Sequence, residues 1–116
     1  ILDDVKGRML EDIVLLEVRK TEPSTMEAFK FKFDAGGEFD MVIYDKASKN
    51  CRIYEIKHST EANEKQTLHL RDAEKCQIVE KRFGPISGKF VLYRGKDTFA
   101  EGVQYLNVEN FLCGLK

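Results

Sequence analysis

The sequence predicts an α/β fold with a mixed central sheet flanked by helices. Three observations lead to it: a helical periodicity near the start, three closely spaced segments that read as strands, and a second helical pattern that precedes another apolar strand. Neighbouring strands pair as an antiparallel meander, whereas a helix between two strands is typical of a crossover connection. The expected order is therefore helix, three strands, helix, strand, and then a small strand and a short helix.

The composition limits the broad class of protein. A chain of 116 residues is long enough for one hydrophobic core, and we expect a single domain over residues 1–116. With 42% hydrophobic and 34% charged residues, the chain is typical of a soluble globular protein rather than a disordered one. It has no long apolar run and no signal peptide, and its three scattered cysteines form no CxxC pair. We therefore expect a cytoplasmic protein with reduced thiols, and the start at Ile1 suggests a fragment of a longer chain.

An amphipathic helix is expected over residues 4–20. Asp3 or Asp4 can cap its start. Glu11 lies at the border of its apolar stripe, where it could point into a site on the sheet or simply reach solvent. The stripe consists of Val5, Met9, Ile13 and Leu16, widened by Leu10, Val14 and Val18.

Three strands are expected next, over residues 28–33, 38–44 and 51–57. The first alternates phenylalanine with lysine, and the turn before the second contains Gly36 and Gly37. Alternation puts Glu38, Asp40, Val42 and Tyr44 on one face of the second strand and Phe39, Met41 and Ile43 on the other. Ile53, Glu55 and Lys57 share a face of the third strand, and pairing can bring Asp40 onto that face if the register is as assumed.

The second half of the chain contains a polar connection, a helix and shorter elements. Residues 59–67 are polar, and residues 68–83 have helical periodicity that ends at Gly84-Pro85. Strands are expected over residues 89–93 and 103–106, separated by a turn at 94–97. Asn107 can cap a last helix that reaches Leu112 and ends at Gly114.

Asp40, Glu55 and Lys57 stand out because they interrupt apolar strand patterns, and burying an unpaired charge is costly. Two carboxylates on adjacent strands suit a hard divalent cation such as Mg²⁺. The backbone carbonyl of Ile56 could be a further ligand, Glu11 could complete the site, and Lys57 could orient an attacking water. The alternative is a cross-strand salt-bridge cluster on a solvated face of the sheet.

The charges are unevenly distributed along the chain. The net charge is −5 over residues 1–45, +6 over residues 46–96 and −2 over residues 97–116. A basic middle beside an acidic start suits contact with phosphates next to a carboxylate metal site. Charge runs that only solvate a surface are an equally good explanation.

The same residues resemble the PD-(D/E)xK nuclease superfamily: an acid on the first helix, an acid after a glycine-rich turn, and Glu-x-Lys on the next strand. More narrowly, nearly the whole chain resembles the uncharacterised nuclease-like domain at the C-terminus of prokaryotic AAA-type ATPases. That resemblance rests on segments 7–11, 38–40, 54–57, 82–86 and 92–95. The chain departs from the superfamily pattern at Phe39, where proline is usual, and at His58, where a small polar residue is usual.

The resemblance implies a restriction-endonuclease-like αβββαβ core and a catalytic set made of Glu11, Asp40, Glu55 and Lys57. It implies Mg²⁺ or Mn²⁺ bound by Asp40, Glu55, Glu11 and the backbone of Ile56. It also implies DNA as the substrate and an upstream ATPase domain of the same polypeptide as a partner.

Two functional hypotheses follow. The first is a metal-dependent nuclease domain that hydrolyses DNA phosphodiesters. The second is a catalytically silent module that binds nucleic acid or protein for its ATPase, since the chain contains no Walker motif. His58 and His69 are expected to have packing or loop roles.

Overall fold

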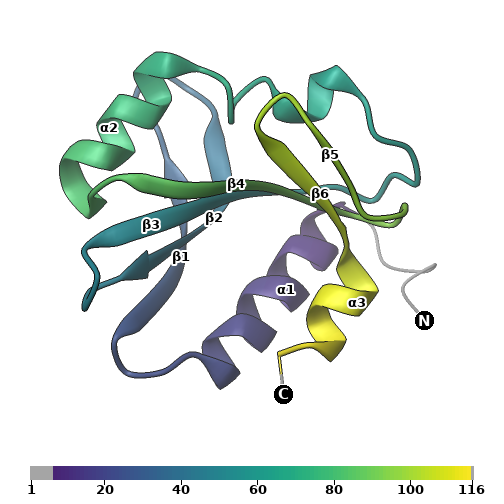
Figure 1. Cartoon of the computed structure of the whole chain (residues 1–116), viewed down its shortest axis with the longest axis horizontal. Helices are drawn as coiled ribbons and strands as arrows, with labels where there is room; N and C mark the ends of the chain where they lie inside the picture. Colours follow the sequence, from purple (N-terminus) through teal and green to yellow (C-terminus); the bar gives the residue numbers. More distant parts are fainter. Residues whose placement is uncertain (1–6, 116) are drawn as a thin grey trace.

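The computed structural model describes residues 7–115, with the side chains of Glu64 and Gln66 left out of that description. Figure 1 shows the elements in chain order. They are α1 (Gly7–Thr21), β1 (Met26–Lys32), β2 (Glu38–Asp45), β3 (Asn50–Ile56), the 3₁₀ helix η2 (Glu64–Thr67), α2 (Ala73–Phe83), β4 (Ile86–Tyr93), β5 (Thr98–Ala100), β6 (Val103–Asn107) and α3 (Val108–Cys113).

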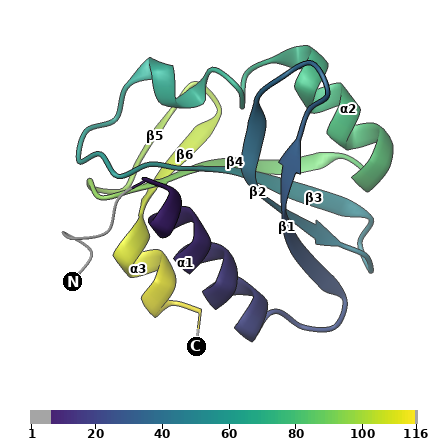
Figure 2. The same ribbon diagram turned by 180° about the vertical axis from the view of Figure 1, so that it is seen from behind.

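The strands form one six-stranded sheet in the order β1-β2-β3-β4-β6-β5. Strands β1, β2 and β3 pair antiparallel, β3 with β4 and β4 with β6 pair parallel, and β5 returns antiparallel to β6. Helices α1 and α3 lie on one side of this sheet and α2 lies on the other (Figures 1 and 2). The predicted α/β class, the mixed sheet and the order αβββαβ are therefore confirmed.

Each side of the sheet has its own hydrophobic core. The core on the α1 side joins that helix and α3 to alternate residues of β2, β3 and β4, and its fully buried members are Leu10, Val14, Met41, Leu92 and Val108. The core on the α2 side contains Leu70 and Val79, with the strand residues Phe39, Val42, Ile53 and Val91. Burial on both sides fixes the register of the central strands, because a slip of one residue would move core side chains to the wrong face of the sheet.

The buried face of α1 differs from the predicted one. Leu10, Val14 and Val18 are the buried positions, whereas Met9 and Leu16 remain 59% and 55% exposed. Residues four apart form one row along a helix, and the sheet contacts this row rather than the one through Met9. The predicted residues 4–6 of the helix, with Val5 and the cap at Asp3 or Asp4, lie outside the described residues.

The second helix begins later than predicted, at Ala73 instead of residue 68. The Asp72 carboxylate accepts hydrogen bonds from the backbone N–H groups of Glu74 (3.0 Å) and Lys75 (3.2 Å), which makes Asp72 the N-cap. Leu70 is buried all the same, in a turn before the helix, and this burial explains the apparent helical period.

The strands of the second half extend beyond their predicted limits. Strand β4 starts at Ile86 instead of Lys89, and the short β5 was not predicted. The predicted end of the chain is confirmed, because the Asn107 side chain accepts a hydrogen bond from the N–H of Asn110 at 3.0 Å and Gly114 follows α3.

A bulge between β1 and β2 interrupts the predicted alternation. Phe29 pairs with Val42 and Phe31 with Phe39, so Lys30 alone opposes both Asp40 and Met41. As a result, Phe39 packs in the α2-side core, and the prediction that it shares a face with Met41 and Ile43 is wrong. The bulge lies beside Asp40, and bulges of this kind commonly redirect a side chain.

The thiols of Cys51 and Cys76 are buried, that of Cys113 is exposed, and all three are unpaired, as predicted. Within residues 7–115, no helix is long and apolar enough to cross a membrane.

The assignment of the buried face of α1 can be tested with two substitutions. We expect Val14→Ala to lower the free energy of unfolding by about 2–3 kcal/mol, because it removes buried methyl groups and leaves a cavity. Leu16→Ala should change it by less than about 0.5 kcal/mol, since this side chain is mainly exposed. Urea denaturation followed by circular dichroism measures both, and a larger loss from Leu16→Ala would contradict the observed helix orientation.

Candidate functional site

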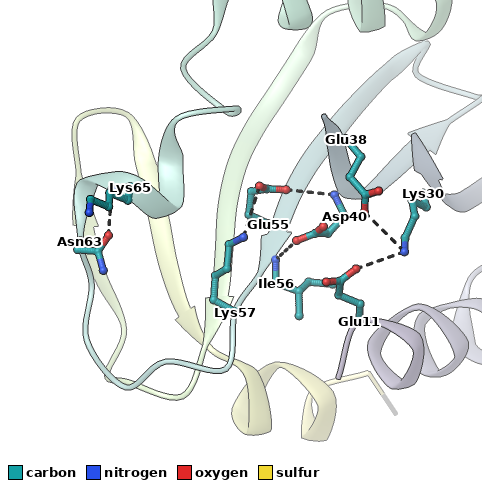
Figure 3. Close-up of polar contacts among 9 residues, drawn as sticks. All are labelled: Glu11, Lys30, Glu38, Asp40, Glu55, Ile56, Lys57, Asn63 and Lys65. Atoms are coloured by element: carbon teal, nitrogen blue, oxygen red, sulfur yellow. Dashed lines mark hydrogen bonds and ion pairs between the residues drawn. The ribbon is translucent and has the colours of Figure 1, made fainter. Parts of the chain in front are cut away.

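The predicted site residues meet at one open cavity of about 370 Å³. Glu11 comes from α1, Asp40 from β2, Glu55 from the end of β3, and Lys57 directly follows β3. Figure 3 shows these four side chains gathered together with Lys30, Glu38 and Ile56. The complete lining consists of Arg8, Glu11, Lys30, Lys32, Gly37, Glu38, Asp40, Glu55, Lys57 and His69.

The carboxylates of Asp40 and Glu55 each accept a hydrogen bond from a backbone N–H of the neighbouring strand. The Asp40 carboxylate accepts a hydrogen bond of 2.8 Å from the N–H of Ile56, and the Glu55 carboxylate accepts one of 3.1 Å from the N–H of Asp40. The backbone pairing of β2 with β3 runs only as far as Met41 and Tyr54. The two carboxylates therefore hold the strands together where the ladder of backbone bonds stops (Figure 3).

Both carboxyl groups are buried, since Asp40 is 6% exposed and Glu55 is 2% exposed. Burial raises the pKa of Asp40 to about 6, against the opposing effect of the hydrogen bond from Ile56. Burial and then the charge of Asp40 raise the pKa of Glu55 to about 8, although Lys57 acts in the opposite direction. Near neutral pH the pair therefore resists carrying two negative charges.

Lys57 lies at the open side of this pair. Its Nζ atom is 3.9 Å from Oε1 of Glu55, and its side chain is 39% exposed whereas that of Glu55 is 3% exposed. The ammonium can therefore interact both with the buried carboxyl group and with a molecule that enters the cavity. Ile56 contributes its N–H to Asp40, and a ligand role for its carbonyl oxygen stays a prediction.

A second acidic group adjoins the pair. One carboxylate oxygen each from Glu11, Glu38 and Asp40 lie within 4.8 Å of one another. Glu38 was not among the predicted site residues, although strand alternation had already placed it on the same face as Asp40. Glu55 lies outside this group of three, so the geometry favours Glu38 over Glu55 as the third carboxylate beside Glu11 and Asp40.

Lys30 holds the acidic group together. Its Nζ atom is 3.3 Å from Glu11 and 3.6 Å from Glu38 (Figure 3). Burial lowers the pKa of Lys30, but the hydrogen bond and charge of Glu11, with the charges of Glu38 and Asp40, outweigh burial and raise it. The sequence predicted that Lys30 lies on the polar face of a strand, but it did not predict its ion pairs. These depend on how α1 docks on β1.

The balance of charge at this site suits a divalent cation. Glu11, Glu38, Asp40 and Glu55 carry four negative charges when ionised. Within residues 7–115, the ammonium groups within ion-pair distance of them are those of Lys30 and Lys57. With all four ionised, two negative charges remain, and a bound cation would favour the ionised forms of Asp40 and Glu55 that burial opposes. Carboxylate oxygens are the ligands that Mg²⁺ and Mn²⁺ prefer. The acidic cluster could therefore hold a divalent ion.

The two histidines differ in position. His69 lines the cavity and His58 does not, and the expected packing or loop role of each stays a prediction. No sequence pattern pointed to His69 as a cavity residue, because its turn packs near the start of β2 only in the folded chain.

Comparison with protein-family models matches residues 6–111 to the Domain of unknown function (DUF4143). The chain belongs to this family. The family description names no activity. The resemblance to the PD-(D/E)xK superfamily therefore rests on the site residues alone. No match to this DUF4143 domain was found among the curated proteins or among the solved structures.

The raised pKa of Glu55 predicts a pH dependence of stability. A folded-state pKa of about 8, above the ordinary value of 4.5, contributes stability that is present below pH 4.5 and lost as the pH rises toward 8. Glu55→Gln cannot ionise, so in EDTA we expect it to become more stable than the wild type by at least about 2 kcal/mol between pH 5 and pH 9. Urea denaturation across this range measures the difference.

Glu27→Gln is the matched control, because the Glu27 side chain is 59% exposed and lies outside the cavity. Its stability should follow that of the wild type throughout this pH range. Parallel curves for Glu55→Gln and the wild type would contradict the raised pKa.

Removing the Lys30 ammonium should destabilise the fold, because Glu11 and Glu38 would then repel each other without a cation between them. In EDTA at neutral pH, we expect Lys30→Met to lower the free energy of unfolding by about 1–2 kcal/mol, because its part-buried carboxylate partners lose their cation. Mg²⁺ should then raise the melting temperature of the variant more than that of the wild type. Lys46→Met, which removes the lysine of an exposed pair with Glu27, should cause neither change; equal effects from both variants would contradict this account.

Proposed function

We propose that this DUF4143 domain is a divalent-metal-dependent nuclease that hydrolyses DNA phosphodiesters. The observation that carries the proposal is the placement of Glu11, Glu38 and Asp40 within 4.8 Å of one another, beside Glu55 and Lys57 in one open cavity. This combination suits metal-assisted phosphodiester hydrolysis, because carboxylates can hold the divalent ion and the lysine can act on the attacking water or the phosphate. It is also the set that the PD-(D/E)xK resemblance implies, with Glu38 added.

Buried carboxylates in a cavity open to solvent support the proposal over a structural salt-bridge cluster. A solvated ion-pair network contributes little to stability and has no need to be buried. Asp40 and Glu55 are nevertheless almost completely buried, and burial raises the pKa of each. Displaced pKa values in a cavity are characteristic of functional sites.

Glu11, Glu38 and Asp40 would hold the ion, with Glu55 beside them. A bound Mg²⁺ or Mn²⁺ would supply positive charge for the phosphodiester under attack and would acidify a water molecule. In the overall reaction the water oxygen bonds to phosphorus, the bond from phosphorus to the leaving oxygen breaks, and the proton from water ends on the leaving oxygen. The residues of the cavity must therefore orient the water, accept a proton and tolerate the added negative charge.

Lys57 and Glu55 have complementary positions for those tasks. The partly exposed Lys57 ammonium can orient the attacking water or stabilise charge on the phosphate oxygens. Glu55, with its pKa raised to about 8, can take up and release a proton near neutral pH. A DNA substrate, and attachment to an upstream ATPase domain of the same polypeptide, are the parts of the proposal that rest on the resemblance.

Metal binding is the first test of this proposal. We expect calorimetric titration with Mn²⁺ to show binding to the wild type, and Asp40→Asn to weaken it by at least about tenfold. Asparagine keeps an oxygen that can accept the hydrogen bond from Ile56, so the strand pairing should survive. Equal affinity in wild type and Asp40→Asn would contradict the proposed metal site.

Cleavage is the second test. Incubation with single-stranded and double-stranded DNA in Mg²⁺ or Mn²⁺ should yield products, and Lys57→Met should lower the rate by about 100-fold or more while the domain stays folded. Glu27→Gln serves as the control outside the cavity. Equal cleavage by the wild type, Lys57→Met and Asp40→Asn would contradict the proposal, whereas DNA binding without products would favour a catalytically silent binding module.

A further inference from the structure

His69 forms part of the wall of the cavity that contains the carboxylates. It lies in the turn between η2 and α2, flanked by Thr67 and Leu70, which are 4% and 0% exposed. The N–H of Asp72 donates to the carbonyl oxygen of His69 at 3.2 Å, and the N–H of Arg71 donates to that of Thr67 at 2.9 Å. The backbone of this turn is therefore held in place while the imidazole remains partly exposed.

The turn before β2 leaves room for this imidazole. A Cβ atom added at Gly37 would lie 2.9 Å from Cε1 and 3.3 Å from Nδ1 of His69, which is too close for the ring to keep its position. Gly37 also has φ +87°, which side-chain-bearing residues rarely adopt. The neighbouring Gly36 has φ +103°, yet a Cβ atom there would meet nothing within 4 Å. The lack of a side chain at residue 37 thus places the imidazole against the backbone that leads to Asp40.

The imidazole makes no hydrogen bond or ion pair with any other residue in the part of the chain that the structure describes. The other side chains that line the cavity are carboxylates or carry basic groups: Arg8, Glu11, Lys30, Lys32, Glu38, Asp40, Glu55 and Lys57. A neutral imidazole offers one N–H donor, and a protonated one offers two. Its donor capacity is therefore available to an anionic molecule in the cavity.

We propose that His69 binds a phosphate oxygen of the nucleic acid strand in the cavity, as a substrate-positioning residue on the wall that it shares with the carboxylates. This inference rests on the proposed nuclease function and extends it by naming a further contact to the substrate. A polyanionic strand that approaches four carboxylates needs donors to hold its phosphates in place. Lys57 and His69 both line the cavity, so they supply one donor from the residue after β3 and one from the turn before α2.

Nuclear magnetic resonance can test the contact without relying on cleavage. The full chain contains two histidines, so the imidazole signals can be assigned from His69→Gln and His58→Gln. The probe is a short phosphorothioate-linked oligothymidylate, which resists hydrolysis, added in the presence of Mg²⁺. We expect the His69 signals to shift as the probe saturates the protein while the His58 signals stay in place.

The variants separate contact from packing. His69→Leu, which removes both ring nitrogens, should weaken probe binding by about ten- to 150-fold, the range for one lost hydrogen bond to a charged group, with Mg²⁺ affinity and melting temperature unchanged. Gly37→Ala, which crowds the ring, should weaken probe binding more than Gly36→Ala, which imposes a comparable backbone strain without the clash.

Probe binding with unmoved His69 signals and full affinity in His69→Leu would overturn this inference and leave the nuclease proposal standing. A melting temperature lowered by His69→Leu at unchanged probe affinity would also overturn it, since the imidazole would then serve packing. Mg²⁺ binding to the wild type with no probe binding would overturn both the His69 contact and the nuclease proposal.

Discussion

The site depends on two hydrogen bonds between β2 and β3: the Glu55 carboxylate accepts from the N–H of Asp40, and the Asp40 carboxylate accepts from the N–H of Ile56. These bonds lie where β2 and β3 stop pairing through their backbones. There, a carboxylate on each strand accepts a hydrogen bond from a backbone N–H of the other strand. Buried N–H groups need partners, and here acidic side chains satisfy them. The same bonds fix the two carboxyl groups next to each other, so the end of a β-ladder also forms the base of a cavity.

This arrangement has a cost in free energy. Burial opposes ionisation of Asp40 and Glu55. The charge of Asp40 makes ionisation of Glu55 still less favourable. Lys57 and Lys30 offset part of the excess charge, each from a different edge of the cavity. A domain that needed these residues only for stability would be better served by apolar side chains of similar size. The cost is understandable if the charges serve a ligand, and a divalent cation is the ligand whose charge and oxygen preference suit them.

The bulge at Asp40 connects the fold to this site. Because Lys30 opposes two residues of β2, Phe39 and Val42 pack on the α2 side while Met41 packs on the α1 side. Asp40 is thereby placed beside Glu11 of α1 as well as Glu55 of β3. Strict alternation cannot produce this geometry, which explains why the face of Phe39 was predicted wrongly and why the ion pairs of Lys30 were not foreseen.

The sequence by itself determined the αβββαβ order and the sheet class, because apolar periodicity is local. It also singled out Asp40, Glu55 and Lys57 as candidate site residues, because charges that interrupt apolar strands are conspicuous, and Glu11 from the border of a helical stripe. The tertiary structure alone decided which row of α1 is buried, where α2 begins, and that Glu38, Lys30 and His69 join the cavity. Those features depend on docking between segments distant in the chain and on one extra residue in a strand. Local sequence patterns do not reveal the docking of distant segments or the position of the bulge, because both depend on how the two cores pack around the sheet.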